Sequence, residues 1–146
     1  MLRVKSRKTL PCPLCGYRLK VNGSKKRGYY ADEVKHILRI RRLRCTTCGK
    51  IHHELPDILI PYKRHSADTI EKIISGRVQE ANVELSTGRR IKAWWEAIFV
   101  YLKNILNSLS VKYQVAYSAD IAPRKIICAA VNTNLYPQTR SAFAPP

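Results

Sequence analysis

The stretch RCTTCGKIHHELPD, residues 44–57, places two cysteines and two histidines within nine residues. Cys45 and Cys48 have the C-x-x-C spacing of a metal-binding knuckle, and 29 residues separate them from an earlier pair, Cys12 and Cys15. Two such knuckles present four thiolates to one ion in a tetrahedron with Zn–S bonds of about 2.3 Å. The sequence therefore predicts a zinc ribbon with one structural Zn²⁺ ion, held by Cys12, Cys15, Cys45 and Cys48.

The residues next to the cysteines support this interpretation. Gly16 and Gly49 each follow the second cysteine of a pair, where glycine lets the chain turn sharply and leaves backbone N–H groups for the sulfurs. A redox C-x-x-C pair is the alternative, but two copies at ribbon spacing disfavour it. With four protein ligands no coordination position stays open, so the site is expected to be structural, and zinc would supply folding free energy. Cys128, a singleton among apolar residues, is expected to be buried.

His52, His53 and Glu54 raise the question of a catalytic zinc site. The H-E-x-x-H spacing is absent, and adjacent histidines on a strand point to opposite faces. No nucleophile–base pair is discernible either, so the sequence predicts no enzyme. Replacement of a cysteine ligand, packing, hydrogen bonding and phosphate contact remain open for the histidines. We take His52 as the candidate nucleic-acid contact.

The hydrophobic pattern predicts an α+β fold with a helical region after a small antiparallel sheet. Residues 1–64 form the zinc ribbon, with a flexible basic lead-in over 1–11, and residues 65–146 form the helical region. In the ribbon we expect a strand over 17–23 with a turn at Asn22–Gly23, a short strand or loop over 24–30, a strand with a bulge over 34–45, and extended chain over 50–61.

The helical region contains a possible helix-turn-helix over residues 66–103. The first helix covers 65–75, with Ser66 as N-cap and Gly76 at its end. Residues 77–86 are ambiguous, and a long helix follows over 86–109, capped by Ser86 or Thr87, with Gly88 as an anomaly in its first turn. We expect a further helix around Arg124–Val131 and an irregular tail over 138–146.

The formal net charge of +17 on 146 residues predicts a polyanionic partner, most often nucleic acid and less often an anionic membrane surface. The excess is uneven: residues 1–65 hold 17 Lys and Arg against four Asp and Glu, and residues 66–146 hold 10 against six. No secretory signal is visible, and the most apolar window, 91–111, is interrupted by charges. An odd number of cysteines suits a reducing compartment. We expect a cytoplasmic, nucleoid-associated protein with no membrane span.

Arginine and lysine side chains that could contact phosphates lie in three segments of the sequence. A solvated basic face is the simpler alternative for the hairpin, and an amphipathic core helix with basic flanks is the alternative for the helix that starts near residue 86. The predicted nucleic-acid contacts, besides His52, are Lys25, Lys26, Arg27, Arg39, Arg41, Arg42 and Arg44 in the hairpin, Lys63 and Arg64 after it, and Arg89, Arg90 and Lys92 on the helix.

The segments CPLCG (12–16), LKVNGSKKR (19–27) and LRIRRLRCTTCGKIHHELPDILIPYKRHSADTIEKII (38–74) together resemble an uncharacterised bacterial zinc-ribbon family. That family is similar to the N-terminal zinc-ribbon and helix-turn-helix region of insertion-sequence transposases. The resemblance covers residues 10–75 and implies zinc binding by the four cysteines and DNA binding linked to mobile elements. A transposase also needs a catalytic domain with three carboxylates, for which this chain has no room.

The sequence thus predicts a stand-alone zinc-ribbon protein that binds duplex DNA, either transposase-related or a transcriptional regulator. An RNA- or ribosome-associated basic zinc-ribbon protein is the first alternative. A protein–protein adaptor is the second, with the helix of Trp94 and Trp95 as the surface for self-association or for a transposase.

Overall fold

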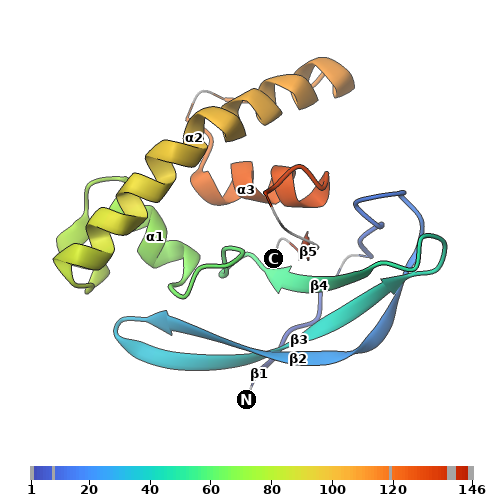
Figure 1. Ribbon diagram of the computed structural model, residues 1–146, viewed down its shortest axis with the longest axis horizontal. Helices are drawn as coiled ribbons and strands as arrows, with labels where there is room; N and C mark the ends of the chain where they lie inside the picture. The colour runs from blue at the N-terminus through green and yellow to red at the C-terminus, as the bar shows by residue number, and fades with distance from the viewer. Residues whose placement is uncertain (1, 8, 119, 138–140, 145–146) are drawn as a thin grey trace.

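The computed structural model describes residues 2–7, 9–118, 120–137 and 141–144. The protein has an α+β fold, as predicted, in which the helices lie on one side of a twisted sheet (Figure 1). The elements in chain order are β1 (Leu2–Arg3), β2 (Leu19–Ala31), β3 (Val34–Cys45), β4 (Ile51–Pro56), α1 (Ala67–Ile74), the 3₁₀-helix η1 (Val78–Ala81), α2 (Leu85–Tyr113), α3 (Pro123–Asn132) and β5 (Ser141–Ala144).

Strands β2 and β3 form one long antiparallel hairpin, and the predicted turn at Asn22–Gly23 is wrong. The hairpin reverses at Asp32 and Glu33, whose φ angles of 48° and 64° are those of a type I′ turn. At Asn22 and Gly23 the strand continues through a bulge, because the pairing passes from Val21 with Leu43 to Ser24 with Arg41. Bulges and hairpin turns both use a glycine with positive φ, here 90° at Gly23, so the dipeptide alone does not distinguish them.

The other edge of β3 pairs with two strands in succession. Arg42–Arg44 pair with Ile51–His53 of β4 in the antiparallel sense, and Leu38 and Arg39 pair with β1 in the parallel sense. Strand β5 then adds to β4. The basic lead-in therefore includes a strand, and the tail predicted to be irregular forms β5 over its described part, residues 141–144. The remaining tail residues, 138–140 and 145–146, lie outside the described part of the chain.

The bulge predicted within residues 34–45 lies instead on the partner strand β2. The pattern that suggested it has another cause. Leu38 and Ile40 belong to the main hydrophobic core, whereas Leu43 and Cys45 belong to a second cluster beside the other cysteines. Because alternate residues of a strand face opposite sides, one regular strand supplies both clusters.

The helices follow the predicted pattern closely. The Ser66 hydroxyl caps α1 by accepting a hydrogen bond of 3.2 Å from the backbone N–H of Thr69, and Gly76 follows the helix with φ of 84°. Helix α2 begins one residue before the predicted cap, after Glu84, so Ser86 and Thr87 are not its caps. Gly88 is buried, and a Cβ at this position would lie 3.2 Å from Val78, so glycine lets η1 pack against α2.

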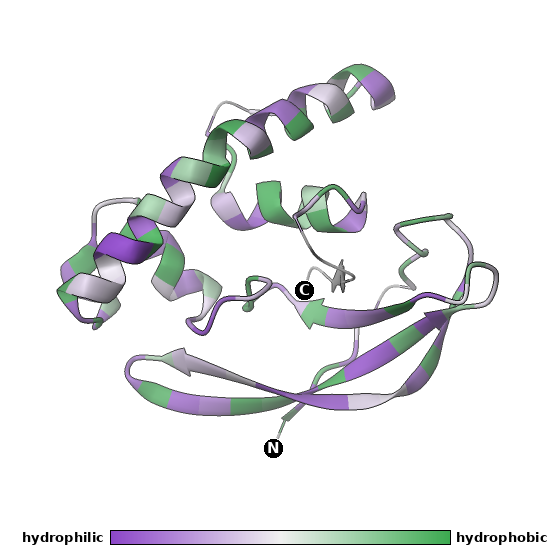
Figure 2. Cartoon of the chain, viewed as in Figure 1, coloured by the Kyte–Doolittle hydropathy of each residue, from purple (hydrophilic) through white to green (hydrophobic). Residues whose placement is uncertain are grey.

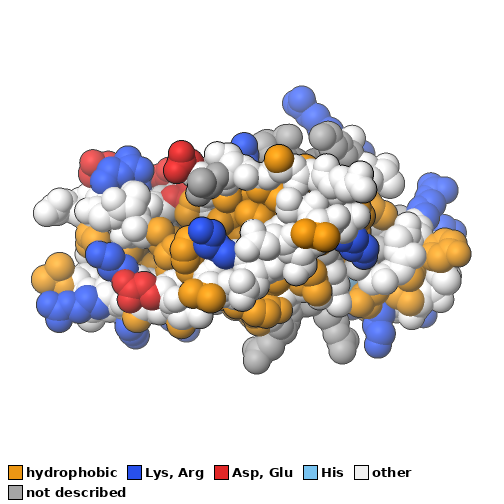
Figure 3. Space-filling view, turned by 90° about the horizontal axis from the view of Figure 1, so that it is seen from above, with side chains coloured by type: hydrophobic (Ala, Val, Ile, Leu, Met, Phe, Trp, Pro, Cys, Tyr) orange, Lys and Arg blue, Asp and Glu red, His pale blue; other side chains and the backbone are white. Residues whose placement is uncertain are grey.

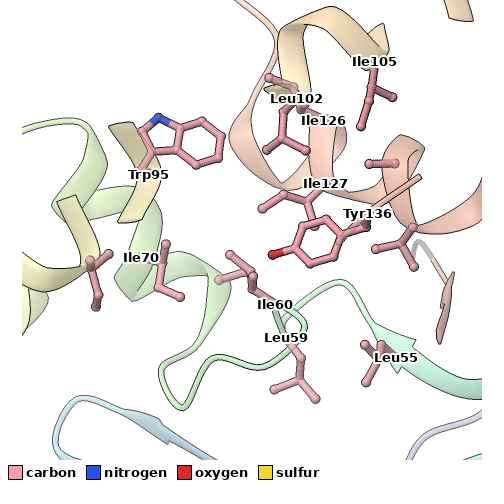
Figure 4. Packing of buried hydrophobic residues seen from close by; sticks show 14 of the residues in the cluster. Leu55, Leu59, Ile60, Ile70, Trp95, Leu102, Ile105, Ile126, Ile127 and Tyr136 are labelled. Carbon is pink, nitrogen blue, oxygen red and sulfur yellow. The ribbon is translucent and has the colours of Figure 1, made fainter. Parts of the chain in front are cut away.

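The main core lies between the sheet and the helices, and it is continuous across residue 64. Leu55, Leu59 and Ile60 come from β4 and the loop after it, and they pack against side chains of all three α-helices, including Ile70, Trp95, Leu102 and Ile127 (Figure 4). Helix α3 is also held by Arg124, whose guanidinium donates to the carboxylate of Glu71 on α1 at 3.0 Å. The ribbon and the helical region thus share one core.

Hydrophilic and hydrophobic residues alternate along the hairpin and along α2, which runs to 29 residues (Figure 2). Although α2 is long, charged residues recur along it, so the helix is not apolar on all sides. In the described part of the chain, no helix combines the length and the apolar character that a bilayer span requires.

Candidate metal centre and basic surface

The four predicted metal ligands come together at one end of the sheet. Cys12 and Cys15 lie in the loop before β2, Cys45 ends β3, and Cys48 lies in the turn before β4 (Figure 1). Their sulfur atoms all lie within 4.8 Å of one another. Sγ of Cys12 is 3.7 Å from Sγ of Cys48, close to the roughly 3.8 Å edge of a tetrahedron with 2.3 Å metal–sulfur bonds. The cluster could therefore hold a metal ion, as the spacing predicted.

Backbone hydrogen bonds shape both knuckles. In the first, the N–H of Gly16 donates to the carbonyl of Cys12 at 2.8 Å. In the second, the N–H groups of Thr47 and Cys48 lie 3.4 and 3.5 Å from Sγ of Cys45. Gly16 and Gly49 have φ of 75° and 72°, the left-handed conformation for which glycine was expected there.

The thiols of Cys12 and Cys45 differ in pKa because their surroundings differ. Burial raises the pKa of Cys12 to about 11, despite hydrogen bonds from the backbone of Cys15 and Leu14. Burial acts in the same direction on Cys45, but hydrogen bonds from the backbone of Cys48 and Thr47 and from neighbouring thiols outweigh it and lower its pKa to about 6. Of these two thiols, Cys45 is thus the more ready to bind an ion as a thiolate, and binding by Cys12 would release a proton.

His52, predicted as a nucleic-acid contact, is buried beside the cysteine cluster. Its side chain is 0% exposed, and Nε2 lies 3.5 Å from Sγ of Cys12. In the register of the sheet, His52 pairs with Leu43 on the side that carries the cysteine cluster. The ring therefore packs against a metal-ligand candidate, where an N–H to sulfur hydrogen bond would fix the orientation of Cys12.

Glu54 forms an ion pair with Arg41, so the guanidinium of this predicted nucleic-acid contact is already engaged by a carboxylate. Nε and Nη2 of Arg41 each donate to the Glu54 carboxylate at 2.6 Å, and the N–H of Ser6 donates to it at 3.2 Å. Glu54 is 1% exposed and the Arg41 side chain 25%. Hydrogen bonding with Glu54 raises the pKa of Arg41 further. The pair ties β3, β4 and the segment after β1 together.

His53, not His52, lies among the basic side chains of the hairpin. It pairs with Arg42 across β3 and β4, and the charges of Lys25, Arg42 and Arg27 all act on it. Burial, followed by these cations, lowers the pKa of His53 below its usual value, so its ring is neutral at pH 7. We call Lys25, Arg27, Arg42 and His53 the hairpin cluster.

The remaining predicted contacts lie in two places, on the hairpin and around the start of α2, and do not form one site. On the hairpin, Lys26 pairs with Arg39, and Nη1 of Arg39 donates to the Ser24 hydroxyl at 3.1 Å. Lys63 is half-buried, with Nζ 4.0 Å from the ring centroid of Trp94. The predicted cations that are exposed are Lys25, Lys26, Arg44, Arg64, Arg89, Arg90 and Lys92.

Trp94 and Trp95 face the interior of the protein. Trp95 is 8% exposed and belongs to the core, and Trp94 packs against that core beneath Lys63. The apolar side chains that α2 exposes include Val100 and Val111 instead.

The loop between β4 and α1 contributes residues that the sequence pattern did not single out. It brings Tyr62 and His65 to the tip of the hairpin, where they meet Tyr30 and the first turns of α2 around a hollow of about 550 Å³. Of this loop, the sequence predicts only Lys63 and Arg64 as nucleic-acid contacts. The position of the loop against the start of α2 depends on the tertiary fold, which leaves no local pattern in the sequence.

The fold and the cluster define a basic α+β protein with four cysteines positioned to bind a metal ion. Residues 12–91 match the family described as a domain of unknown function (DUF6431), and the chain belongs to that family. The match includes both cysteine pairs, the hairpin, β4, α1 and the first turns of α2. Its description names neither a zinc ribbon nor a transposase. No curated protein and no solved structure matches the chain.

Proposed function

We propose that the protein binds duplex DNA through its basic hairpin, and that one structural Zn²⁺ ion holds the base of this hairpin in place. The observation that carries the proposal is the hairpin cluster, in which Arg42 pairs with His53 across β3 and β4 and the charges of Lys25 and Arg27 also act on the neutral ring of His53. Gathered cations without a carboxylate among them suit phosphate oxygens. Glu54 of β4 is already neutralised by Arg41, and the carboxylates of the hairpin itself, Asp32 and Glu33, lie at its turn.

The charge distribution over the surface supports the same proposal. On the face seen in Figure 3, the acidic side chains lie toward the end of the molecule that carries α1 and the start of α2, and Lys and Arg side chains lie at both ends. The first 65 residues carry a net charge of +13, with 17 Lys and Arg against four Asp and Glu. A polyanion would therefore be attracted to the hairpin and to the cysteine end.

Zinc is the metal that the cluster favours. Four thiolates in a tetrahedron are the donor set of structural zinc sites, whereas hard cations such as Mg²⁺ and Ca²⁺ prefer oxygen. The second hydrophobic cluster, which includes Leu19 and Leu43, is small, so this end of the sheet has little apolar burial to stabilise it. A metal would supply the missing free energy and set the angle between β3 and the loop before β2.

Helix α2 would make the second contact with DNA, in the manner of a recognition helix. Arg89, Arg90 and Lys92 are exposed on its first turns, while Ile91 and Trp95 pack inward. In helix-turn-helix proteins the N-terminal residues of the second helix reach base edges. Here ten residues, including η1, join α1 to α2, so the proposed arrangement has a longer turn than the usual three or four residues.

With a DNA partner the protein would be nucleoid-associated, as a transcriptional regulator or a transposase-related protein, and it would not itself be an enzyme. RNA is the second candidate ligand, favoured by Tyr30, a half-exposed aromatic at the hairpin tip that could stack on unpaired bases.

The experiment is fluorescence anisotropy with a blunt 20-base-pair duplex and the double variant Lys25→Gln/Arg42→Gln. We expect the dissociation constant to rise at least about tenfold, because two phosphate contacts are lost. Lys125→Gln, an exposed cation on α3, is the matched control and should leave binding within about twofold. Equal loss in both variants, or no loss in either, would refute a role of the hairpin cluster.

A further inference from the structure

We propose that the hollow at the hairpin tip binds one unpaired nucleotide of a single-stranded DNA segment. The inference rests on the proposed function, since it assigns a more specific ligand to the same nucleic-acid-binding protein. The hollow lies between the tip of the β2–β3 hairpin, the loop before α1 and the start of α2. Its volume of about 550 Å³ is that of a small-molecule site. The side chains that line it include Tyr30, Tyr62, Lys63, Arg64, His65 and Arg90.

Hydrogen bonds between the loop and the hairpin form one wall of the hollow in advance. The N–H of Tyr30 donates to the carbonyl of Arg64 at 2.7 Å, and the N–H of Ser66 donates back to the carbonyl of Tyr30 at 2.9 Å. Nη2 of Arg27 donates to the carbonyl of Lys63 at 2.9 Å. Because the backbone is fixed on both sides of Arg64, a ligand would meet the basic side chains without first ordering the loop.

The charge of the hollow suits a phosphate group. Lys63, Arg64 and Arg90 supply cations, and none of the described residues that line the hollow is acidic. Thr87 and Arg90 also place the N-terminal turns of α2 at its rim, where the partial positive charge of a 29-residue helix adds to these cations.

The aromatic side chains of the hollow offer surfaces on which a base can stack, and a phosphate alone would not use them. Tyr30 and Tyr62 are 38% and 64% exposed, and the ring of His65 lies 6.2 Å from that of Tyr30 at an angle of 45°. Burial, with the charge of Arg64, lowers the pKa of His65, so its ring is neutral at pH 7 and can lie against a base. Cations beside stacking surfaces are the combination by which proteins bind single strands.

Tyr62 is held in an unusual backbone conformation. Its φ of 63° lies in the left-handed region, which is rare for a large side chain and occurs at binding sites more often than elsewhere. The adjoining Lys63 carbonyl accepts the hydrogen bond from Arg27, so the tertiary structure stabilises this conformation. The strain has a use if the tyrosine ring must be presented to a ligand.

A neighbouring hollow explains why the site would bind one nucleotide and not a longer stretch of the strand. It has a volume of about 390 Å³ and shares Tyr30, His65 and Thr87 with the basic hollow, but it is lined by Asp32, Glu33 and Glu84. Carboxylates would repel the next phosphate of a strand that continued past Tyr30 and His65. The strand would therefore enter from the basic side, insert one base and leave on the same side. A base paired in a duplex could not enter, because its stacking face is covered.

The test compares a blunt 20-base-pair duplex with the same duplex carrying a four-nucleotide thymidine tail, by fluorescence anisotropy of the zinc-loaded protein. We expect the tailed duplex to bind at least about tenfold more tightly, as one stacked base allows. Tyr62→Ala should abolish this preference while leaving blunt-duplex affinity within about twofold, and Tyr62→Phe, which keeps the ring, should retain it. The melting temperature of each variant shows whether a lost preference comes from lost binding or from lost folding.

The outcomes are separable. Absence of a preference for the tailed duplex, or a preference that survives in Tyr62→Ala, would overturn the inference and leave duplex binding standing. If the blunt duplex does not bind but the free tail does, and this binding depends on Tyr62, the proposed duplex function is overturned. The assignment of the hollow to an unpaired nucleotide is then supported. A preference for an RNA tail alone would overturn the assignment to DNA. Competition by thymidine monophosphate at the affinity of the tail would show a free-nucleotide site, and would overturn the assignment to a strand.

Discussion

Nε2 of His52 lies 3.5 Å from Sγ of Cys12, and the histidine ring is fully buried between the sheet and the cysteine cluster. The neighbouring His53 faces the other side of the same strand, toward Lys25, Arg27 and Arg42. Two adjacent histidines therefore serve two different sites, one at the candidate metal and one at the basic surface. This division makes them a matched pair for experiment.

Substitution of His52 should weaken metal binding, and substitution of His53 should not. His52→Ala removes the hydrogen bond that orients Cys12, and loss of such an outer partner lowers metal affinity about 10- to 100-fold. Competition for Zn²⁺ with a chromophoric chelator would measure this. Comparable zinc affinities in His52→Ala and His53→Ala would show that the contact with Cys12 does not support the metal.

Removal of the metal should loosen one end of the protein and leave the other folded. The cysteine cluster lies beside the small second hydrophobic cluster, whereas the main core contains the side chains from α1, α2 and α3. After chelation, hydrogen exchange should accelerate over residues 12–19 and 43–50 and stay slow in the core helices. Unchanged exchange over residues 12–19 would mean that no metal stabilises the knuckles.

Glu54→Gln should destabilise the protein by about 2 to 3 kcal/mol, because it leaves the half-buried guanidinium of Arg41 without its carboxylate. Urea unfolding of the zinc-loaded protein would measure the loss. Glu80→Gln is the control, since its ion pair with Arg77 is exposed and should contribute less than about 1 kcal/mol. Similar small losses in both variants would show that the Arg41–Glu54 pair does not tie the strands together.

Acidification should destabilise the protein in part through His53. Burial and the nearby cations lower the pKa of His53 in the folded state, so the unfolded chain binds this proton more tightly. The stability due to the neutral ring is complete above the ordinary pKa of about 6.5, and it is lost as the pH falls from there toward the lower folded value. His53→Asn should lose less stability than wild type between pH 7.5 and 5.5 in urea unfolding, and parallel losses would contradict this assignment.

What the sequence could predict was set by local chemistry. The C-x-x-C pairs with their glycines, the Ser66 cap and the apolar stripe of α2 are each fixed within a few residues, and each was found where expected. The turn at Asp32–Glu33 was not predicted. Asn22–Gly23 has the sequence of a hairpin turn, but a glycine of positive φ serves a bulge equally well.

The features that depend on strand register or on packing could not be predicted in the same way. Which histidine faces the metal depends on the pairing of β4 with β3, and a shift of one residue would exchange His52 and His53. The engagement of Arg41 by Glu54, 13 residues away, follows from the same register. The hollow beside Tyr62 joins three segments that only the tertiary fold brings together.

The salt dependence of duplex binding tests the central claim most directly. The logarithm of the binding constant for a blunt duplex should fall linearly with the logarithm of salt concentration, by about 0.9 for each phosphate neutralised. We predict that Lys25→Gln/Arg42→Gln lowers this slope by about two, and that the control Lys125→Gln leaves it unchanged. A slope near zero for the wild-type protein, or the same slope in the double variant, would contradict binding of DNA by the hairpin cluster.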